Sequence, residues 1–148
     1  MIPATDYGSN CEASCVVSCP SGWERKGDRC YLWRKDWETW FEAEETCKRH
    51  GGHLASVTDQ HIHDYMLGRT GFAWIGGFLG NKESSWAWSD CSEWTFDSGW
   101  KEGQPDDLDK EKCVEYCSPG SNGNGWSNDH CYNFKPFVCS KRICSGIT

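Results

Sequence analysis

Several features that are missing from this sequence narrow the kinds of protein it can encode. It holds no apolar run of membrane-spanning length, and its first residues have neither the basic start nor the apolar core of a secretory signal. We therefore expect that the signal has been removed or replaced by an initiator Met. No Asn-x-Ser/Thr sequon occurs, so N-glycosylation is not expected. With 15 Lys and Arg against 22 Asp and Glu, the net charge of -7 disfavours nucleic-acid binding, which needs a basic face.

Motifs for zinc binding and for catalysis are missing as well. The chain has no Cys-x-x-Cys pair, and its nearest approach is the series Cys11, Cys15 and Cys19, so the cysteines do not indicate a zinc site. His61 and His63 are two residues apart, which on a helix points them to different sides, and we expect both at the surface. No arrangement of Ser, His and Asp or of Cys and His suggests nucleophilic catalysis. We therefore predict that the protein is not an enzyme.

Cysteine and tryptophan, by contrast, are abundant. Eleven cysteines in 148 residues indicate an oxidising, extracellular setting and a framework of disulfides, so we expect a secreted protein. The length suits one domain with a modest hydrophobic core. Ten tryptophans are many for this size. We expect most of them to fill a core that is poor in aliphatic residues, with only one or two at a binding surface.

Two helices and several short strands are expected along the chain. Thr39 and Glu42 form a Ser/Thr-x-x-Glu capping box at the start of the first helix, and Gly51 and Gly52 end it. A second, shorter helix is expected to begin near Thr58. Strand patterns fall at residues 30–33, 72–75, 86–88, 113–117 and 137–139.

The segment of residues 91–112 has little helix or strand pattern, and irregular loops of this length are usually functional. Within it, Gln104 and Asp106 flank Pro105, and if the bond before the proline is cis, both side chains point the same way. A further carboxylate, Glu111, follows in the same segment. These oxygens suit a hard cation such as calcium. One or two more could come from the segment after the Gly-rich run, which supplies Ser127, Asn128 and Asp129.

The order and spacing of the tryptophans, glycines and cysteines resemble those of the C-type lectin domain. The residues that carry the likeness are Cys19-Pro20, Trp74-Ile75-Gly76-Gly77, Trp86-Ala87-Trp88-Ser89-Asp90, Trp100, Gly103-Gln104-Pro105-Asp106, Cys113, Trp126, Cys131 and Phe137-Val138-Cys139. The resemblance implies an α+β, disulfide-rich C-type lectin-like fold with two helices, small antiparallel sheets and a long irregular binding loop. It divides the chain into an N-terminal arm at residues 1–18, a long-form lectin domain at 19–140 and a C-terminal tail at 141–148 that carries Cys144.

The resemblance also implies a disulfide pattern. It pairs six cysteines as Cys19 with Cys30, Cys47 with Cys139, and Cys113 with Cys131. The other five are Cys11, Cys15, Cys91, Cys117 and Cys144. Because five is an odd number, at least one of them is free or bridges to another chain. One intrachain bridge between the termini and one interchain bridge is the simplest arrangement, and we predict a disulfide-linked dimer.

For function, the resemblance implies a secreted lectin of the kind found in innate immunity, in which a loop-bound calcium completes its shell with two vicinal sugar hydroxyls. The order Gln-Pro-Asp goes with galactose-type selectivity in the family, so sugars of the galactose or N-acetylhexosamine type are expected. The residues predicted to bind both sugar and calcium are Gln104, Asp106, Glu111, Asn128 and Asp129.

Three departures from the family's pattern leave other readings open. Where the family has Trp-Asn-Asp, Ser127 and Asn128 follow Trp126, so the carboxylate is lost in simple register and a one-residue bulge would be needed to restore Asn128 and Asp129. No aromatic residue follows Gln-Pro-Asp, and the loop is one residue shorter than in typical calcium-binding members. The alternatives are calcium-independent binding of sugar, through an acetamido group, and a lectin-fold protein that binds protein, mineral or ice.

Overall fold

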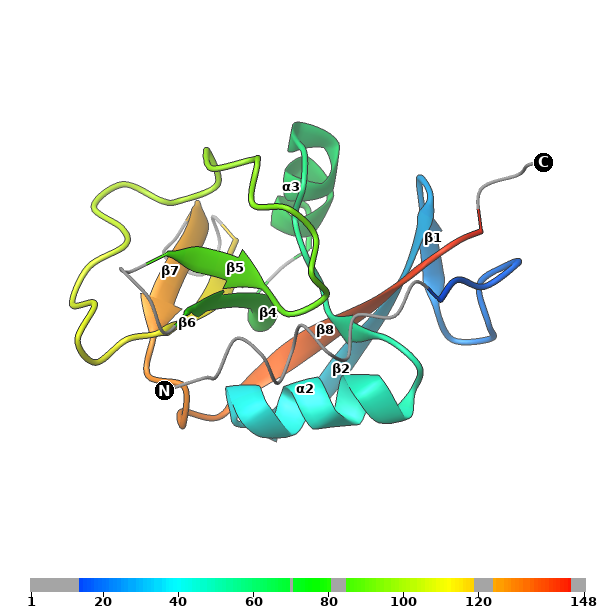
Figure 1. The fold of residues 1–148 in the computed structure, drawn as a ribbon, viewed down its shortest axis with the longest axis horizontal. Helices are drawn as coiled ribbons and strands as arrows, with labels where there is room; N and C mark the ends of the chain where they lie inside the picture. Colours follow the sequence, from blue (N-terminus) through cyan, green and yellow to red (C-terminus); the bar gives the residue numbers. More distant parts are fainter. Residues whose placement is uncertain (1–13, 70, 81–84, 119–123, 145–148) are drawn as a thin grey trace.

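The computed structural model describes residues 14–69, 71–80, 85–118 and 124–144. Two helices, α2 (Trp40–Arg49) and α3 (Gln60–Leu67), pack against one mixed sheet of eight strands (Figure 1). The sheet follows the order β1-β2-β8-β4-β6-β7, with β3 added to β8 and β5 added to β4. The strands are β1 (Glu24–Lys26), β2 (Arg29–Glu38), β3 (His53–Leu54), β4 (Phe72–Leu79), β5 (Trp86–Trp88), β6 (Cys113–Cys117), β7 (Gly125–Asp129) and β8 (Lys135–Arg142).

The α+β class and the two helices agree with the prediction from sequence, and the strands add detail. The expected small antiparallel sheets are joined into one hydrogen-bonded sheet, because β4 pairs in parallel with β8 through Trp74 and Phe137. Every other strand pairing is antiparallel. Strand β7 was not expected, because its Gly, Ser, Asn and Asp residues have low strand propensity. It forms because its backbone pairs with β6 and its first four residues, Gly125 to Asn128, are buried in the fold.

Helix α2 begins and ends as its sequence indicates. Thr39 Oγ1 accepts a hydrogen bond from the Glu42 amide at 3.1 Å, and the Thr39 amide donates to Glu42 Oε1 at 3.1 Å, which completes the capping box. Past the helix, Gly52 lies so close to β8 that a Cβ atom would stand 2.3 Å from the Ser140 carbonyl oxygen. Glycine is therefore needed there to let the sheet approach the end of the helix.

Helix α3 begins near Thr58, as predicted, but the position of one of its histidines differs from the prediction. Asp59 caps the helix, with Oδ1 accepting from the Ile62 amide at 3.0 Å. His61 is exposed, as expected. His63 is not at the surface: it is only 7% exposed, and its ring packs on Phe96 and Trp126. Helix spacing separates the two histidines correctly, but it could not reveal that a distant loop covers one of those sides.

All three disulfides implied by the resemblance are present. A fourth, Cys15–Cys144, joins the arm to the tail beside a bridge between Val16 and Ile143, so the intrachain link between the termini is present too. Cys91 is also disulfide-bonded. Cys117 is the free cysteine among the described residues, and it is buried. Cys11 lies outside the described residues, and the interchain bridge stays a prediction.

Candidate functional site

The segment of residues 89–112 crosses the end of the sheet without helix or strand, apart from one bridge between Trp100 and Trp126. Figure 1 shows it as the long green-to-yellow loop beside β5, β6 and β7. Its backbone is tied to β7, because Lys101 donates to the Trp126 carbonyl at 3.0 Å and Trp126 donates to the Gly99 carbonyl at 2.7 Å. A Cβ atom on Gly99 would stand 2.2 Å from the Trp126 ring, so the loop lies directly on the indole.

Aromatic side chains form the base of this loop. The Trp94 ring stacks on Trp88 at a centroid distance of 4.2 Å, and Trp100 and Phe96 meet Trp126 edge-on at 5.4 and 5.8 Å. Offset and edge-on contacts of this kind add to the free energy gained from burying the rings. The tryptophans are therefore mainly structural, as predicted, and they hold the loop where no backbone ladder does.

Asn128 fixes the predicted binding residues relative to one another. Its side chain is buried, at 4% exposure for the residue, on strand β7. Oδ1 accepts from the Asp106 amide at 3.1 Å, while Nδ2 donates to the carbonyls of Asp106 and Glu111 at 2.5 and 2.7 Å. Its backbone amide lies 3.4 Å from Gln104 Oε1. One amide side chain thus joins both halves of the predicted site, and its own polar atoms are engaged within the protein.

Strand β7 runs in unbroken register against β6, from Cys113 opposite Asp129 to Cys117 opposite Gly125. The one-residue bulge that would have moved Asn128 and Asp129 is therefore not present. Ser127 faces inward, where its hydroxyl donates to Glu115 Oε2 at 2.9 Å.

Asp106 and Glu111 bring two carboxylates together at the loop surface. Partial burial, a side-chain hydrogen bond to Asp106 and the charges of Asp106, Asp129 and Asp107 raise the pKa of Glu111 above its usual value. Asp106 is exposed and Glu111 half-buried. The peptide bond between Gln104 and Pro105 is cis, the geometry that the sequence left open.

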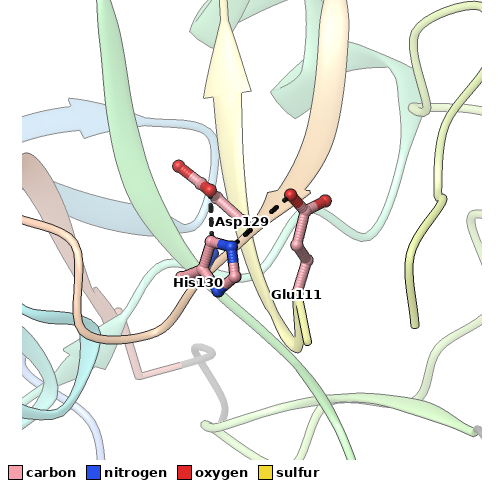
Figure 2. Close-up of side chains that lie close together, drawn as sticks. All are labelled: Glu111, Asp129 and His130. Carbon is pink, nitrogen blue, oxygen red and sulfur yellow. Dashed lines mark hydrogen bonds and ion pairs between the residues drawn. The ribbon is translucent and has the colours of Figure 1, made fainter. Parts of the chain in front are cut away.

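Asp129 and His130 complete the cluster from the end of β7 (Figure 2). Ligand atoms of Glu111, Asp129 and His130 lie within 4.8 Å of one another. Lys135 Nζ lies 2.7 Å from Asp129 Oδ2. Burial acts to raise the pKa of Asp129, but the Lys135 and His130 hydrogen bonds hold it below its usual value. Asp129 is thus compensated by a lysine, whereas the partner of Glu111 is His130, whose Nε2 lies 4.0 Å from Glu111 Oε2 and carries charge only when protonated.

The structure therefore brings all five predicted residues into one region but gives them different surroundings. Asp106 and Glu111 offer carboxylate oxygens at the surface, Gln104 and Asp129 are partly engaged, and Asn128 is enclosed. Oxygens of this kind fit a hard cation, which would also relieve repulsion between the carboxylates. Sequence reasoning missed His130 and Lys135. His130 directly follows Asp129 and could have been included, but only the fold brings Lys135 back beneath the site.

Comparisons with known proteins agree with this architecture. A model of the Lectin C-type domain matches residues 36–141. The galactose-specific lectin nattectin of Thalassophryne nattereri is 34% identical over an alignment that covers 95% of this chain and 91% of that protein. The structure of a calcium-independent type II antifreeze protein superposes with a TM-score of 0.79 at 27% identity, covering 87% of this chain and 98% of that one. The calcium-independent C-type lectin SPL-2 from Saxidomus purpuratus superposes with a TM-score of 0.76 at 26% identity, covering 90% and 100%.

Three statements follow from the comparisons and the structure. The protein is a member of a family of binding proteins and is not an enzyme, as the sequence predicted. Among the described residues, no helix has both the length and the apolar character needed to cross a membrane. The match to residues 36–141 and the nattectin alignment show that this chain belongs to the C-type lectin domain family.

Proposed function

We propose that the protein is a secreted lectin that binds galactose or N-acetylhexosamine type sugars at the surface formed by Gln104, Asp106 and Glu111, with calcium as the bridging ion. The observation that carries the proposal is the pair of adjacent carboxylates on Asp106 and Glu111, where burial and the neighbouring acids raise the pKa of Glu111 and the facing cation is a histidine, His130, 4.0 Å from Glu111. The 34% identity to a galactose-specific lectin and the order Gln-Pro-Asp support the choice of sugar.

Each residue has a distinct part in this proposal. Calcium, when bound, would accept two vicinal sugar hydroxyls into its shell. The carboxylates of Asp106 and Glu111 accept hydrogen bonds from those hydroxyls. Gln104, whose Oε1 is turned toward the Asn128 amide, presents its Nε2 as a donor. Asn128 holds the loop, and Asp129 lies at the edge of the cluster beside Lys135.

A glycan array with calcium, repeated with chelator, tests the proposal. We expect galactose-type binding that chelator removes. Asp106→Ala should weaken binding by about tenfold or more, since a charge-assisted contact is lost. Asp109→Ala is the matched control, because Asp109 is an exposed acid of the same loop outside the cluster. Tight selectivity for mannose, or equal loss in both variants, would contradict the proposal.

A calcium-independent lectin is the second candidate, and the engagement of Asn128 favours it. Asn128 stands where the family has a carboxylate, and its side chain makes three hydrogen bonds within the protein. A residue that would otherwise bind calcium is therefore already engaged. The likeness to calcium-independent SPL-2 points the same way. In that case binding of acetamido sugars survives chelator but is lost in Asp106→Ala.

Ice binding is the candidate outside the sugar class. It is supported by the superposition on a calcium-independent type II antifreeze protein, with a TM-score of 0.79. Thermal hysteresis of the purified protein measures it directly. Hysteresis together with a blank glycan array would replace the lectin proposal.

A further inference from the structure

A polar cleft of about 470 Å³ lies where the end of α2, β3 and the ends of β2 and β8 meet residues 14–16 and the start of the 89–112 segment. It shares no lining residue with the cluster of Gln104, Asp106 and Glu111. We call it the basic cleft, because it gathers cationic groups in a chain whose net charge is -7. The charged and titratable residues that line it are Arg29, Lys48, His53, Lys141, Arg142 and a single acid, Asp90.

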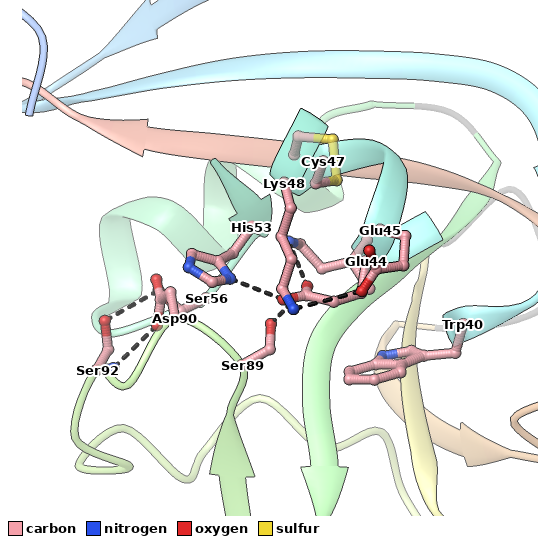
Figure 3. A network of polar contacts seen from close by, with 12 residues as sticks. Trp40, Glu44, Glu45, Cys47, Lys48, His53, Ser56, Ser89, Asp90 and Ser92 are labelled. Carbon is pink, nitrogen blue, oxygen red and sulfur yellow. Dashed lines mark hydrogen bonds and ion pairs between the residues drawn. A yellow bond between two sulfur atoms is a disulfide. The ribbon is translucent and has the colours of Figure 1, made fainter. Parts of the chain in front are cut away.

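Internal partners account for only part of this positive charge. Arg29 pairs with Asp90 at 3.1 Å, with both side chains nearly buried. His53 bonds the fully buried Glu44 at 2.7 Å (Figure 3). Lys141 and Arg142, by contrast, make no ion pair with any described residue. Lys141 lies over the Trp23 ring at 4.6 Å, and Arg142 is exposed.

The sheet register adds a second reason to expect an anion. Arg29 and Arg142 are direct partners across the β2–β8 ladder, and like charges placed opposite each other are destabilising. His53 and Ser140 are partners across β3–β8, two residues along β8 from Arg142, which puts them on the same face. Asp90 offsets one of the two arginines, and the second has no counter-charge among the described residues.

The space in the cleft comes from two glycines. Gly51 and Gly52 line it without side chains, and a Cβ atom on Gly51 would stand 3.1 Å from the Lys141 ammonium. The amides of both glycines already donate to carbonyls of α2, at 2.9 Å each. Recognition in the cleft therefore falls to the side-chain cations, of which an Arg fork and a Lys point charge are the usual partners of oxyanions.

We propose that the basic cleft binds a tetrahedral oxyanion, a sulfate or phosphate group, through Arg142, with Lys141 on the opposite face of β8 adding to the positive charge that lines the cleft. The volume lies within the range of small-molecule sites, so the group can be carried by a ligand of sugar size. A concave site in which cations outnumber acids also raises the local concentration of anions. The proposal does not depend on what the Gln104 loop binds.

Isothermal titration calorimetry of the folded protein with sodium sulfate and sodium phosphate tests this, with sodium chloride at equal ionic strength as the reference. We expect saturable binding at one site. The double variant Lys141→Gln/Arg142→Gln should weaken it by about tenfold or more. The double variant Arg25→Gln/Lys35→Gln makes the same charge change at exposed residues outside the cleft and should leave it within about twofold.

Amide resonances locate the bound ion independently of the variants. Shifts at Gly51, Gly52 and Lys141 on titration support the proposal, and shifts confined to residues 104–111 would overturn it. Absence of saturable binding of either ion would also overturn it, as would equal weakening in the two double variants, since that would indicate only diffuse attraction.

The source of the group is distinguished with galactose 6-sulfate and galactose 6-phosphate. Both are titrated into the Asp106→Ala variant, so that binding at the Gln104 loop does not contribute. Tighter binding of the sulfate ester identifies sulfated glycans as the ligand class, and tighter binding of the phosphate ester identifies phosphorylated sugars. Either ester must lose affinity in the Lys141→Gln/Arg142→Gln background, and an unchanged affinity there would contradict the assignment to the cleft.

Discussion

The half of the molecule built from α2, β2 and β8 and the half that carries residues 89–112 are stabilised in different ways. The first has long paired strands and three disulfides, Cys15–Cys144, Cys19–Cys30 and Cys47–Cys139. The second has the bridge Cys113–Cys131, the disulfide-bonded Cys91, and a loop that lies on stacked tryptophans and is tied by one asparagine. Because side chains rather than a backbone ladder hold that loop, its surface oxygens are free to be arranged for binding.

The largest expected effect separates the two halves. Removing the Cys47–Cys139 bridge as Cys47→Ala/Cys139→Ala should lower the free energy of unfolding by about 2–5 kcal/mol, since the bridge closes a long segment of chain. Sugar binding by the fraction that stays folded should be unchanged, because the loop lies in the other half. Urea unfolding measures the first quantity and calorimetry with galactose the second. A loss of sugar binding without a loss of stability would contradict the claim that the two halves are stabilised independently.

A smaller loss is expected for Asn128→Ala, of about 1–3 kcal/mol, because partly buried amide and carbonyl groups of the loop lose their hydrogen bonds. Here the effect on binding should exceed the effect on stability, since the Asp106 and Glu111 segments lose their common anchor. Hydrogen exchange should speed up at the Asp106 amide and stay slow in β8. Uniformly faster exchange would mean that Asn128 supports the whole fold rather than the loop.

His63, which is buried, and His53, which is half-buried, should respond to pH in opposite directions. Burial lowers the pKa of His63 beneath the loop, against the weaker pull of Asp64. Its unfolded form therefore binds a proton more readily, so stability falls as pH drops below about 6.5 toward the folded pKa. In His63→Leu this loss should shrink. Unfolding in urea at pH 7.5 and 5.5 provides the measurement, and an equal loss in the variant would contradict the assignment.

His53 lies in the disulfide-rich half and shows the reverse sign. Burial acts to lower its pKa, but the hydrogen bond and charge of Glu44 outweigh burial and raise it. The stabilisation is therefore present below about pH 6.5 and is lost as pH rises through the higher folded pKa. His53→Gln should flatten this upper part of the pH profile while leaving the acid-side loss. The measurement is the free energy of unfolding as a function of pH. If His53→Gln changed stability only at acidic pH, the role assigned to His53 would be refuted.

The smallest effect concerns Cys117, which lies in the loop-bearing half. Cys117 is only 7% exposed. Burial is the main cause of the raised pKa of its thiol, and the charge of Glu115 raises the pKa further. Because the thiolate is the reactive form, alkylation should be very slow in the native protein and complete after unfolding. Mass spectrometry of the modified peptide measures this. Rapid native labelling would show that β6 opens readily.

The elements that local sequence governs were predicted from it. The capping box at Thr39 and Glu42 is a matter of neighbouring residues, and it forms as expected. The apolar and aromatic strand cores at 72–75, 86–88 and 113–117 were identified for the same reason. Strand β7 was not, because its pairing with β6 rather than its own composition stabilises it.

By itself, the sequence determined the family, the disulfide-rich α+β class and the set of residues that meet near the loop. Only the tertiary structure decided what those residues do there. Asn128 is enclosed because β7 pairs without a bulge, Asp129 is compensated because Lys135 returns from β8, and His63 is buried because the loop covers α3. The physical reason is the same in each case: burial and charge compensation come from partners far apart in the chain, and residue spacing carries no record of them.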